Sequence, residues 1–223
     1  MRKLIVAIDG PAGAGKSTVA KRVAKEMGYT YMDTGAMYRA FAWRVANEGL
    51  DLHNEKELRA ALRDTHIELA ERDGRAQVLL NGVDVSAWIR TPEISQMASR
   101  VSTSKIVRER MVELQREMGA RGGIVAEGRD IGTVVFPEAE VKIYLDASSN
   151  ERARRRFEEL RGEGGGVDME RTLAEMEQRD RRDKEREVAP LRPADDAVVI
   201  DSTGVDVEGV VERIMAEIKK HLR

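Results

Sequence analysis

Short apolar runs alternate along the chain with longer stretches in which apolar residues recur at helical spacing. The short runs predict buried strands at 3–9, 29–32, 123–127, 140–146 and 197–201. The longer stretches predict helices at 16–27, 36–48, 104–120, 149–161, 168–184 and 206–221. Candidate helix starts are Ser104, Ser149 or Asn150, and Val205-Asp206. Because strands alternate with helices, the pattern predicts an α/β fold built on a doubly wound parallel sheet.

The pattern changes between residues 65 and 88, where short alternating segments replace the helical spacing. Two such segments, 65–70 and 76–80, are separated by Asp73-Gly74, and the second is followed by Asn81-Gly82. These dipeptides are strong hairpin signals. We expect a small antiparallel sheet inserted into the α/β core. A helix should resume at Thr91-Pro92, since Thr is a good N-cap and Pro fits the first helical position.

A second break is the glycine-rich stretch 162–166, which joins two helical segments dense in arginine. Acidic residues are interleaved with these arginines, so most of them are expected to form ion pairs on solvated helix faces. Arg179, Asp183 and Arg186 share one helix face at i, i+4 and i+7. Because a guanidinium fits phosphate oxygens as a fork, this face predicts a helical lid that closes on a phosphoryl group.

The apolar run near the amino end leads directly into a phosphate-binding loop of the form G-x-x-x-x-G-K-[ST]. Such a loop turns backbone N–H groups toward a polyphosphate, while its lysine adds a charge and its hydroxyl binds Mg²⁺. We therefore predict binding of ATP with Mg²⁺, and Ser17 as the metal ligand. The ATP-binding residues predicted from the motif are Gly10, Pro11, Ala12, Gly13, Ala14, Gly15, Lys16, Ser17 and Thr18.

Composition excludes several other classes of protein. The 38 Lys and Arg residues against 40 Asp and Glu give a net charge of −2, which does not favour a nucleic-acid partner. Cysteine is absent, and His53, His66 and His221 fit no metal motif. The chain shows neither a secretory signal nor a membrane-spanning run, so we expect a cytoplasmic protein without a membrane partner.

Three other patterns have simpler explanations. Asp33-Thr34-Gly35 matches the tripeptide of aspartic proteases, but the chain holds one copy in an α/β context. The stretch 201–204 fits the D-x-x-G pattern of GTPases, yet no N-K-x-D motif accompanies it, which favours a strand-to-helix turn. The remaining pattern consists of methionines at apolar positions, interpreted as core residues: Met32, Met37, Met97, Met111, Met118 and Met176.

Taken together, five segments resemble the bacterial cytidylate kinases, a branch of the nucleoside monophosphate kinases. The segments are 9–18, 33–39, 128–137, 145–148 and 179–190, the last without Glu187. The resemblance implies a P-loop NTPase fold in one kinase domain. Its core would comprise 1–34, 104–150 and 190–223, with a monophosphate-binding insertion at about 35–103 and a lid at about 151–189.

The resemblance also implies roles for individual side chains. Arg39 and Arg129 would clamp the α-phosphate of the acceptor, and Asp183 would contact its ribose. The other acceptor-binding residues would be Thr34, Tyr38, Ser99, Arg108, Asp130, Arg179 and Arg186. Thr34 stands where relatives carry Ser, which keeps the hydroxyl. Catalysis would depend on Lys16, Arg129, Arg179 and Arg186.

Base recognition would fall to Ser99, Arg108 and Asp130. The exocyclic N4 amino group of cytosine is a hydrogen-bond donor, and a carboxylate accepts from it, whereas the O4 atom of uracil would face that carboxylate as a second acceptor. Discrimination against UMP is therefore expected at Asp130.

The predicted reaction is transfer of the γ-phosphoryl group of ATP to CMP or dCMP by a monomeric enzyme. No strong general base is required, because the acceptor phosphate is already anionic. Two alternatives are a kinase for another nucleoside monophosphate or small metabolite and a nucleotide-dependent switch. Sequence leaves open the choice of ATP or GTP and of ribose or deoxyribose. It also leaves open whether Asp33 holds metal-bound water or orients Arg39, and which arginine of 152–156 reaches phosphate.

Overall fold

The structure is a computed structural model that describes residues 3–72, 75–162 and 168–222. The chain divides into two compact units: unit 1 is Met1–Tyr31 with Arg121–Arg223, and unit 2 is Met32–Ala120. Unit 2 contains the stretch 35–103 and also residues 104–120. The expected turn at Asp73-Gly74 and the glycine-rich stretch after Gly162 lie outside the described residues.

A five-stranded sheet forms the centre of unit 1, in the order β2-β6-β1-β7-β8. Its strands are β1 (Ile5–Asp9), β2 (Thr30–Asp33), β6 (Ile124–Gly128), β7 (Val141–Asp146) and β8 (Val198–Asp201). The pairings of β1 with β6 and β7, and of β7 with β8, are parallel. All five predicted strands are present, and the predicted α/β class is confirmed. The last two residues of β2 belong to unit 2.

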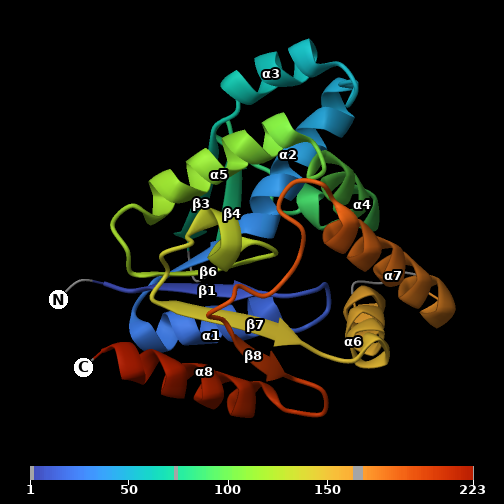
Figure 1. Ribbon diagram of the computed structural model, residues 1–223. Helices are drawn as coiled ribbons and strands as arrows, with labels where there is room; N and C mark the ends of the chain where they lie inside the picture. Colours follow the sequence, from blue (N-terminus) through green and yellow to red (C-terminus); the bar gives the residue numbers. More distant parts are fainter. Residues whose placement is uncertain (1–2, 73–74, 163–167, 223) are drawn as a thin grey trace. The chain divides into compact units, whose positions relative to one another are not determined.

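Two helices, α1 (Lys16–Met27) and α8 (Val207–His221), cover one face of this sheet and lie side by side beneath β1, β7 and β8 in Figure 1. Their apolar stripes and the strands above them form one core, in which Ile8, Val23 and Ile214 are completely buried. Helix α1 ends at Gly28, which adopts a left-handed conformation. Helix α8 begins after Asp206, whose carboxylate accepts from the Gly209 N–H at 2.8 Å.

Two further helices of unit 1, α6 (Ser149–Gly162) and α7 (Met169–Glu185), follow β7 and pack against each other. Figure 1 shows them beyond the carboxyl end of β7. Between β6 and β7 the chain makes a π-helical turn at Ile131–Val135, which the sequence pattern did not predict. Such turns occur often at functional sites.

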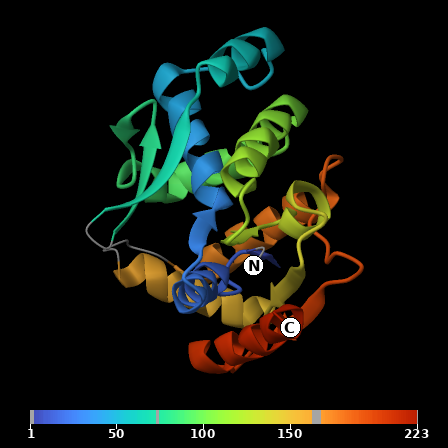
Figure 2. The ribbon, with the colours of Figure 1, turned by 90° about the vertical axis from the view of Figure 1, so that its left-hand side faces the viewer.

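Unit 2 combines helices with the predicted antiparallel sheet. The sheet has the order β3-β4-β5, with β3 (Ile67–Arg72), β4 (Arg75–Leu80) and β5 (Val83–Asp84). Its helices are α2 (Thr34–Glu48), α3 (Glu55–Arg63), α4 (Pro92–Val101) and α5 (Lys105–Gly119), with a short 3₁₀ turn at Trp88–Arg90. Figure 2 shows α2 lying between the small sheet and α5. Met37, Phe41 and Met111 of this core are fully buried.

Helix starts in unit 2 follow capping side chains. Thr91 accepts from the Ile94 N–H at the start of α4, as predicted. Helix α2 begins at Thr34 rather than at residue 36, because the Asp33 carboxylate accepts from the Ala36 N–H at 2.8 Å. Helix α3 was not predicted, although Asn54 caps it in the same way.

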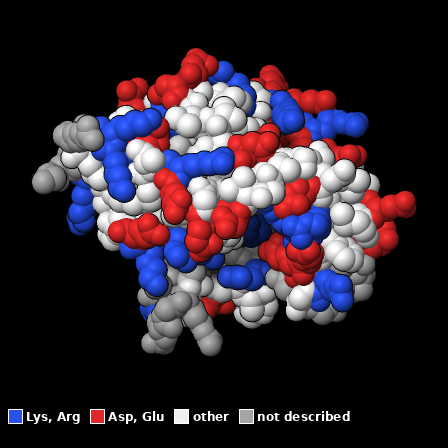
Figure 3. Space-filling model, turned by 90° about the horizontal axis from the view of Figure 1, so that it is seen from below, with Lys and Arg blue, Asp and Glu red and all other residues white. Residues whose placement is uncertain are grey.

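Charged side chains of both signs share the surface. Figure 3 shows Lys and Arg intermixed with Asp and Glu on the face that it draws, in keeping with the net charge of −2. Among the described residues, no helix combines the length and the apolar character needed to span a membrane.

Candidate functional site

The phosphate-binding loop connects β1 to α1 in unit 1, at the carboxyl end of the central strand of the sheet. Two of its glycines are required by their surroundings. A Cβ atom on Gly10 would lie 1.9 Å from the carbonyl oxygen of Leu145, and one on Gly13 would lie 2.7 Å from that of Arg152. Both residues also have positive φ angles, +150° and +74°. No larger residue fits either position.

Lys16 is the buried charge of the loop, with an exposed fraction of 6%. Its ammonium donates to the carbonyl oxygen of Pro11 at 2.6 Å. Burial, together with the nearby charges of Arg129 and Arg179, lowers the pKa of Lys16 to about 7. A negative charge near this ammonium would raise its pKa. Ser17 follows on the first turn of α1 and is exposed.

The outer side of the loop is held through its carbonyl oxygens. Arg152 of α6 donates from Nη1 to the carbonyl of Ala12 at 3.0 Å. Arg155 of the same helix lies 3.4 Å from the carbonyl of Ala14, and the Ser202 hydroxyl lies 3.2 Å from it. Two arginines of 152–156 therefore contact the backbone of the loop.

The other two arginines of this stretch face acidic residues of their own helix. Arg154 pairs with Glu151 and Glu158, and Arg156 pairs with Glu159 at 2.6 Å. These are the ion pairs on a solvated face that the interleaved charges predict. Neither of these two arginines has a contact with the phosphate loop among the described residues.

Asp9 ends β1 directly before the loop and is 4% exposed. Its two carboxylate oxygens accept from the N–H groups of Ile131 and Gly132, each at 2.8 Å. Burial raises the pKa of Asp9 to about 6, against the lowering effect of these two hydrogen bonds. One carboxylate therefore ties the start of the phosphate loop to the π-helical turn that follows Asp130.

Arg129 and Asp183 form an ion pair, with Nε and Oδ2 separated by 2.8 Å. Asp183 is buried, and Arg129 is partly buried. Burial alone would raise the pKa of Asp183, but the charges of Arg129, Arg179 and Arg186 outweigh it and hold the pKa below its ordinary value. Burial would lower the pKa of Arg129, but Asp183 keeps it raised. Both groups are therefore charged at neutral pH.

Asp130 lies beside a second guanidinium. Its Oδ1 is 3.4 Å from Nη2 of Arg186, and both side chains are buried. Arg186 also donates from Nε to the carbonyl of Ala189 at 2.5 Å. Unit 1 thus brings together six of the residues proposed for the site: Lys16, Arg129, Asp130, Arg179, Asp183 and Arg186.

Unit 2 holds the other residues proposed to bind the acceptor. Asp33 pairs with Arg39 at 3.0 Å, so this carboxylate orients Arg39 and also caps α2. The guanidinium of Arg108 lies over the ring of Tyr38, 5.8 Å from its centroid. The remaining residues of the set, Thr34 and Ser99, are buried.

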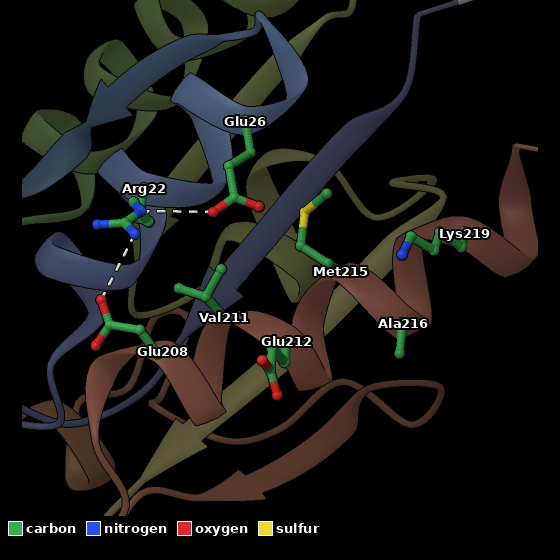
Figure 4. A pocket seen from close by; sticks show the side chains of 8 residues that line it. All are labelled: Arg22, Glu26, Glu208, Val211, Glu212, Met215, Ala216 and Lys219. Atoms are coloured by element: carbon green, nitrogen blue, oxygen red, sulfur yellow. Dashed lines mark ion pairs between the residues drawn. The ribbon is translucent and has the colours of Figure 1, made fainter.

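A groove of about 430 Å³ lies elsewhere in unit 1, between α1 and α8. In Figure 4, Arg22 stands between Glu26 and Glu208, at 3.4 and 3.5 Å. The groove is lined from the later turns of α1, whereas the phosphate loop meets the first turn of that helix. None of the residues proposed for the site lines it.

Sequence reasoning assigned no role to two residues that shape the loop, Asp9 and Ser202, and it did not distinguish Arg152 from the other arginines of 152–156. Asp9 carried a signal, since it is a charged residue that directly follows a buried strand. Ser202 was part of the 201–204 stretch, which the structure confirms as a strand-to-helix turn between β8 and α8. Its hydroxyl nevertheless lies against the loop, and the sequence carried no sign of that contact.

The chain is similar to known proteins over nearly its whole length. The family model "Cytidylate kinase" matches residues 6–220. The cytidylate kinase of Syntrophotalea carbinolica is 52% identical over 96% of this chain and 91% of its own length. That of Geobacillus kaustophilus is 52% identical over 99% of both chains.

Solved structures support the fold at low identity. An uncharacterized protein from Eubacterium ventriosum superposes with a TM-score of 0.54 at 14% identity, covering 98% of this chain and 99% of its own. The shikimate kinase of Bacteroides thetaiotaomicron superposes with a TM-score of 0.50 at 11% identity, covering 97% and 98%. With a family match across nearly its whole length, the chain belongs to the cytidylate kinase family.

Proposed function

We propose that the protein transfers the γ-phosphoryl group of ATP to CMP, and to dCMP as well, giving ADP and CDP or dCDP. The observation that carries the proposal is the charge arrangement of unit 1. A buried lysine inside a complete phosphate loop lies near the charges of Arg129 and Arg179. Arg129 and Arg186 pair with the buried carboxylates of Asp183 and Asp130. Phosphoryl transfer asks a protein mainly for position and for charge that stabilises the transition state.

ATP binds in the phosphate loop under this proposal. Backbone N–H groups of residues 13–18 contact the β- and γ-phosphates, and the dipole of α1 adds to their attraction. Lys16 brings its charge to the transferring group. Because the phosphates are anionic, their binding raises the pKa of Lys16 and keeps it protonated.

Mg²⁺ is the proposed cofactor, and Ser17 its protein ligand. No cluster of three or more acidic, histidine or cysteine residues that could hold a metal occurs among the described residues. A single hydroxyl donor from the protein fits Mg²⁺, which keeps several waters and binds largely through substrate phosphates. The ion would neutralise charge that develops on the phosphate oxygens. The exposure of Ser17 on the first turn of α1 supports this role.

The acceptor nucleotide is proposed to bind to the residues that the family resemblance assigns to it. Arg39 and Arg129 contact its α-phosphate, which suits bidentate guanidinium geometry. Thr34, Tyr38, Ser99 and Arg108 surround the nucleoside. The carboxylate of Asp183 accepts from ribose, and Arg179 and Arg186 bind phosphate. The ion pairs of Asp33 with Arg39 and of Asp183 with Arg129 support these roles, since each holds a guanidinium in a fixed orientation.

Asp130 is proposed to read cytosine. Its carboxylate is buried and kept in place by Arg186, so it offers an acceptor of defined position to the N4 amino group. Uracil would place its O4 atom, another acceptor, against the same carboxylate. This arrangement favours CMP over UMP.

Asp130→Asn should relax that preference. The new amide can donate to O4 of uracil, so we expect the ratio of kcat/KM for CMP to that for UMP to fall by about 10- to 100-fold. The KM for ATP should stay within about threefold of wild type, since the phosphate loop is unchanged. Steady-state rates with both acceptors measure the ratio. Asp206→Asn, which changes a helix cap far along the chain from this loop, is the matched control.

An unchanged ratio with equal losses on both acceptors would show that Asp130 acts only through its ion pair with Arg186. The amide would then weaken the packing of the site without altering base recognition.

The function itself is tested by ADP release with a panel of acceptors: CMP, dCMP, UMP, AMP and dTMP. We expect CMP and dCMP to be preferred, and release without an acceptor to be negligible. A preference for another acceptor would favour a kinase for a different metabolite. Acceptor-independent hydrolysis would favour a nucleotide switch.

A further inference from the structure

The carbonyl oxygens of the phosphate loop have identifiable partners, and one of these partners reaches beyond the loop to α7. Within a trans peptide unit, the C=O of one residue and the N–H of the next point in opposite directions. The carbonyl of Ala12 therefore fixes the direction of the Gly13 N–H. The residue that holds this carbonyl is Arg152, at 3.0 Å.

Arg152 is fixed on several sides and is 6% exposed. Its Nε donates to the carbonyl of Ala147 at 3.0 Å, just after β7. Its Nη1, which contacts the loop, also lies 2.6 Å from Oδ2 of Asp180 on α7. Its Nη2 lies 3.3 Å from the Ser149 hydroxyl. A planar guanidinium in such a frame has little freedom to turn.

Asp180 depends on this pairing in return. Its carboxylate is buried, and its second oxygen, Oδ1, finds no hydrogen-bond partner among the described residues. Burying a charge without a partner is costly, so the contact with Arg152 stabilises the carboxylate. Asp180 lies next to Arg179 on α7. The Arg152–Asp180 pair thus connects the helix that carries Arg179 to the phosphate loop.

The backbone of the loop is closely packed at Gly13. A Cβ atom there would meet the carbonyl oxygen of Arg152 at 2.7 Å and Cε of Met176 at 2.9 Å. Residues of α6 and α7 therefore pack closely against the peptide unit between Ala12 and Gly13. Arg152 donates to the carbonyl of this same unit. If the Arg152 guanidinium moved, the direction of the Gly13 N–H would change with it.

We propose that Arg152 is a positioning residue for phosphoryl transfer, which aims the Gly13 N–H at the ATP phosphates through the carbonyl of Ala12, while Asp180 sets the guanidinium. The inference rests on the proposed function. Arg152 needs no contact with substrate to act in this way. Its effect is expected on nucleotide affinity and on kcat, and not on the affinity for the acceptor.

The chain supplies a matched control on the same helix. Arg154 lies two residues from Arg152 and bonds to Glu151 and Glu158 of α6, with about half of its side chain exposed. Removing its charge changes the composition of α6 as much as removing that of Arg152. No contact of Arg154 with the loop is found among the described residues.

Arg152→Lys, Arg152→Met, Asp180→Asn and Arg154→Met test the proposal. For Arg152→Met we expect kcat to fall about 30-fold and the Kd for ADP, measured by calorimetry, to rise about 10-fold. For Arg152→Lys we expect losses in kcat and in ADP affinity that are about half as large as those of Arg152→Met on a logarithmic scale. One ammonium keeps the charge but cannot reach all the partners of the guanidinium. Asp180→Asn should lose about fivefold in kcat. The KM for CMP should stay within about threefold, and Arg154→Met should match wild type.

Two further readouts separate positioning from a structural role. The amide resonance of Gly13 in an ¹⁵N-labelled protein should move in Arg152→Lys and Asp180→Asn, while the melting temperature of Arg152→Lys should stay near wild type. An unmoved resonance with unchanged ADP affinity would overturn the proposal, as would an equal loss of affinity for both substrates. If Arg152→Met fails to fold, Arg152→Lys and Asp180→Asn still decide. ADP binding needs no acceptor, so this arm stands even if CMP proves not to be the substrate.

Discussion

Replacing Lys16 with methionine should lower kcat by about 10³-fold, because the charge that stabilises the transferring phosphoryl group is lost while the volume of the side chain is kept. Lys16 is buried inside the loop, where its ammonium donates to the carbonyl oxygen of Pro11. A coupled assay at saturating ATP and CMP measures kcat. Lys25→Met, an exposed position in the last turn of α1, is the control and should match wild type.

The same variant should gain stability. Folding lowers the pKa of Lys16 from 10.5 to about 7, so the folded state disfavours the charged form. This penalty is absent above pH 10.5, grows as the pH falls and is fully present below pH 7. Lys16→Met should therefore raise the free energy of unfolding by on the order of 2 kcal/mol at pH 6, and by less at pH 9.

Urea denaturation at the two pH values measures this difference. A variant that is less stable than wild type at pH 6 would mean that the hydrogen bond to Pro11 outweighs the burial of the charge. An active Lys16→Met would refute the role given to the lysine.

Arg129→Met should destabilise the protein by about 3–5 kcal/mol, since it leaves the buried carboxylate of Asp183 without its closest partner. It should also abolish measurable transfer to CMP. The double variant Arg129→Met/Asp183→Leu removes both charges, so it should recover most of the stability but none of the activity. Denaturation at pH 7 and the acceptor assay report the two effects separately.

The pH dependence of this loss has a defined direction. The pKa of Asp183 is below its ordinary value of 3.8, so its ion pairs stabilise the wild type above that pH, and the contribution disappears as the pH falls through the lowered pKa. The stability difference between wild type and Arg129→Met should therefore narrow in strong acid. A single variant as stable as wild type, or an active double variant, would contradict the assignment.

Much of the fold was readable because its signals are local. Each strand of the parallel sheet is an apolar run bounded by polar residues, and each long helix repeats its apolar positions over several turns. Helix α3 spans nine residues, so its apolar stripe of Leu58, Ala61 and Leu62 is too short to give a clear helical repeat. The π-helical turn could not be predicted, since its shape depends on Asp9, 122 residues away from Ile131.

In the candidate site, too, residues within a local motif were predictable, and contacts between distant positions were not. Residues 10–18 lie within one motif, so their placement follows from the sequence itself. The pairing of Arg129 with Asp183 joins positions 54 residues apart, and spacing on α7 showed only that Asp183 shares a face with arginines. Four arginines at 152–156 look alike in the sequence. Which of them contacts the loop depends on how α6 is rotated against β1 and α7.

The two hydrogen bonds that Asp9 accepts have a consequence for turnover. Ile131 and Gly132 belong to an irregular segment that would otherwise sample many conformations. Anchored by a carboxylate that no ligand has to supply, this segment takes its working shape as the polypeptide folds. The entropy of ordering it is lost once in the lifetime of the molecule and does not recur in each catalytic cycle.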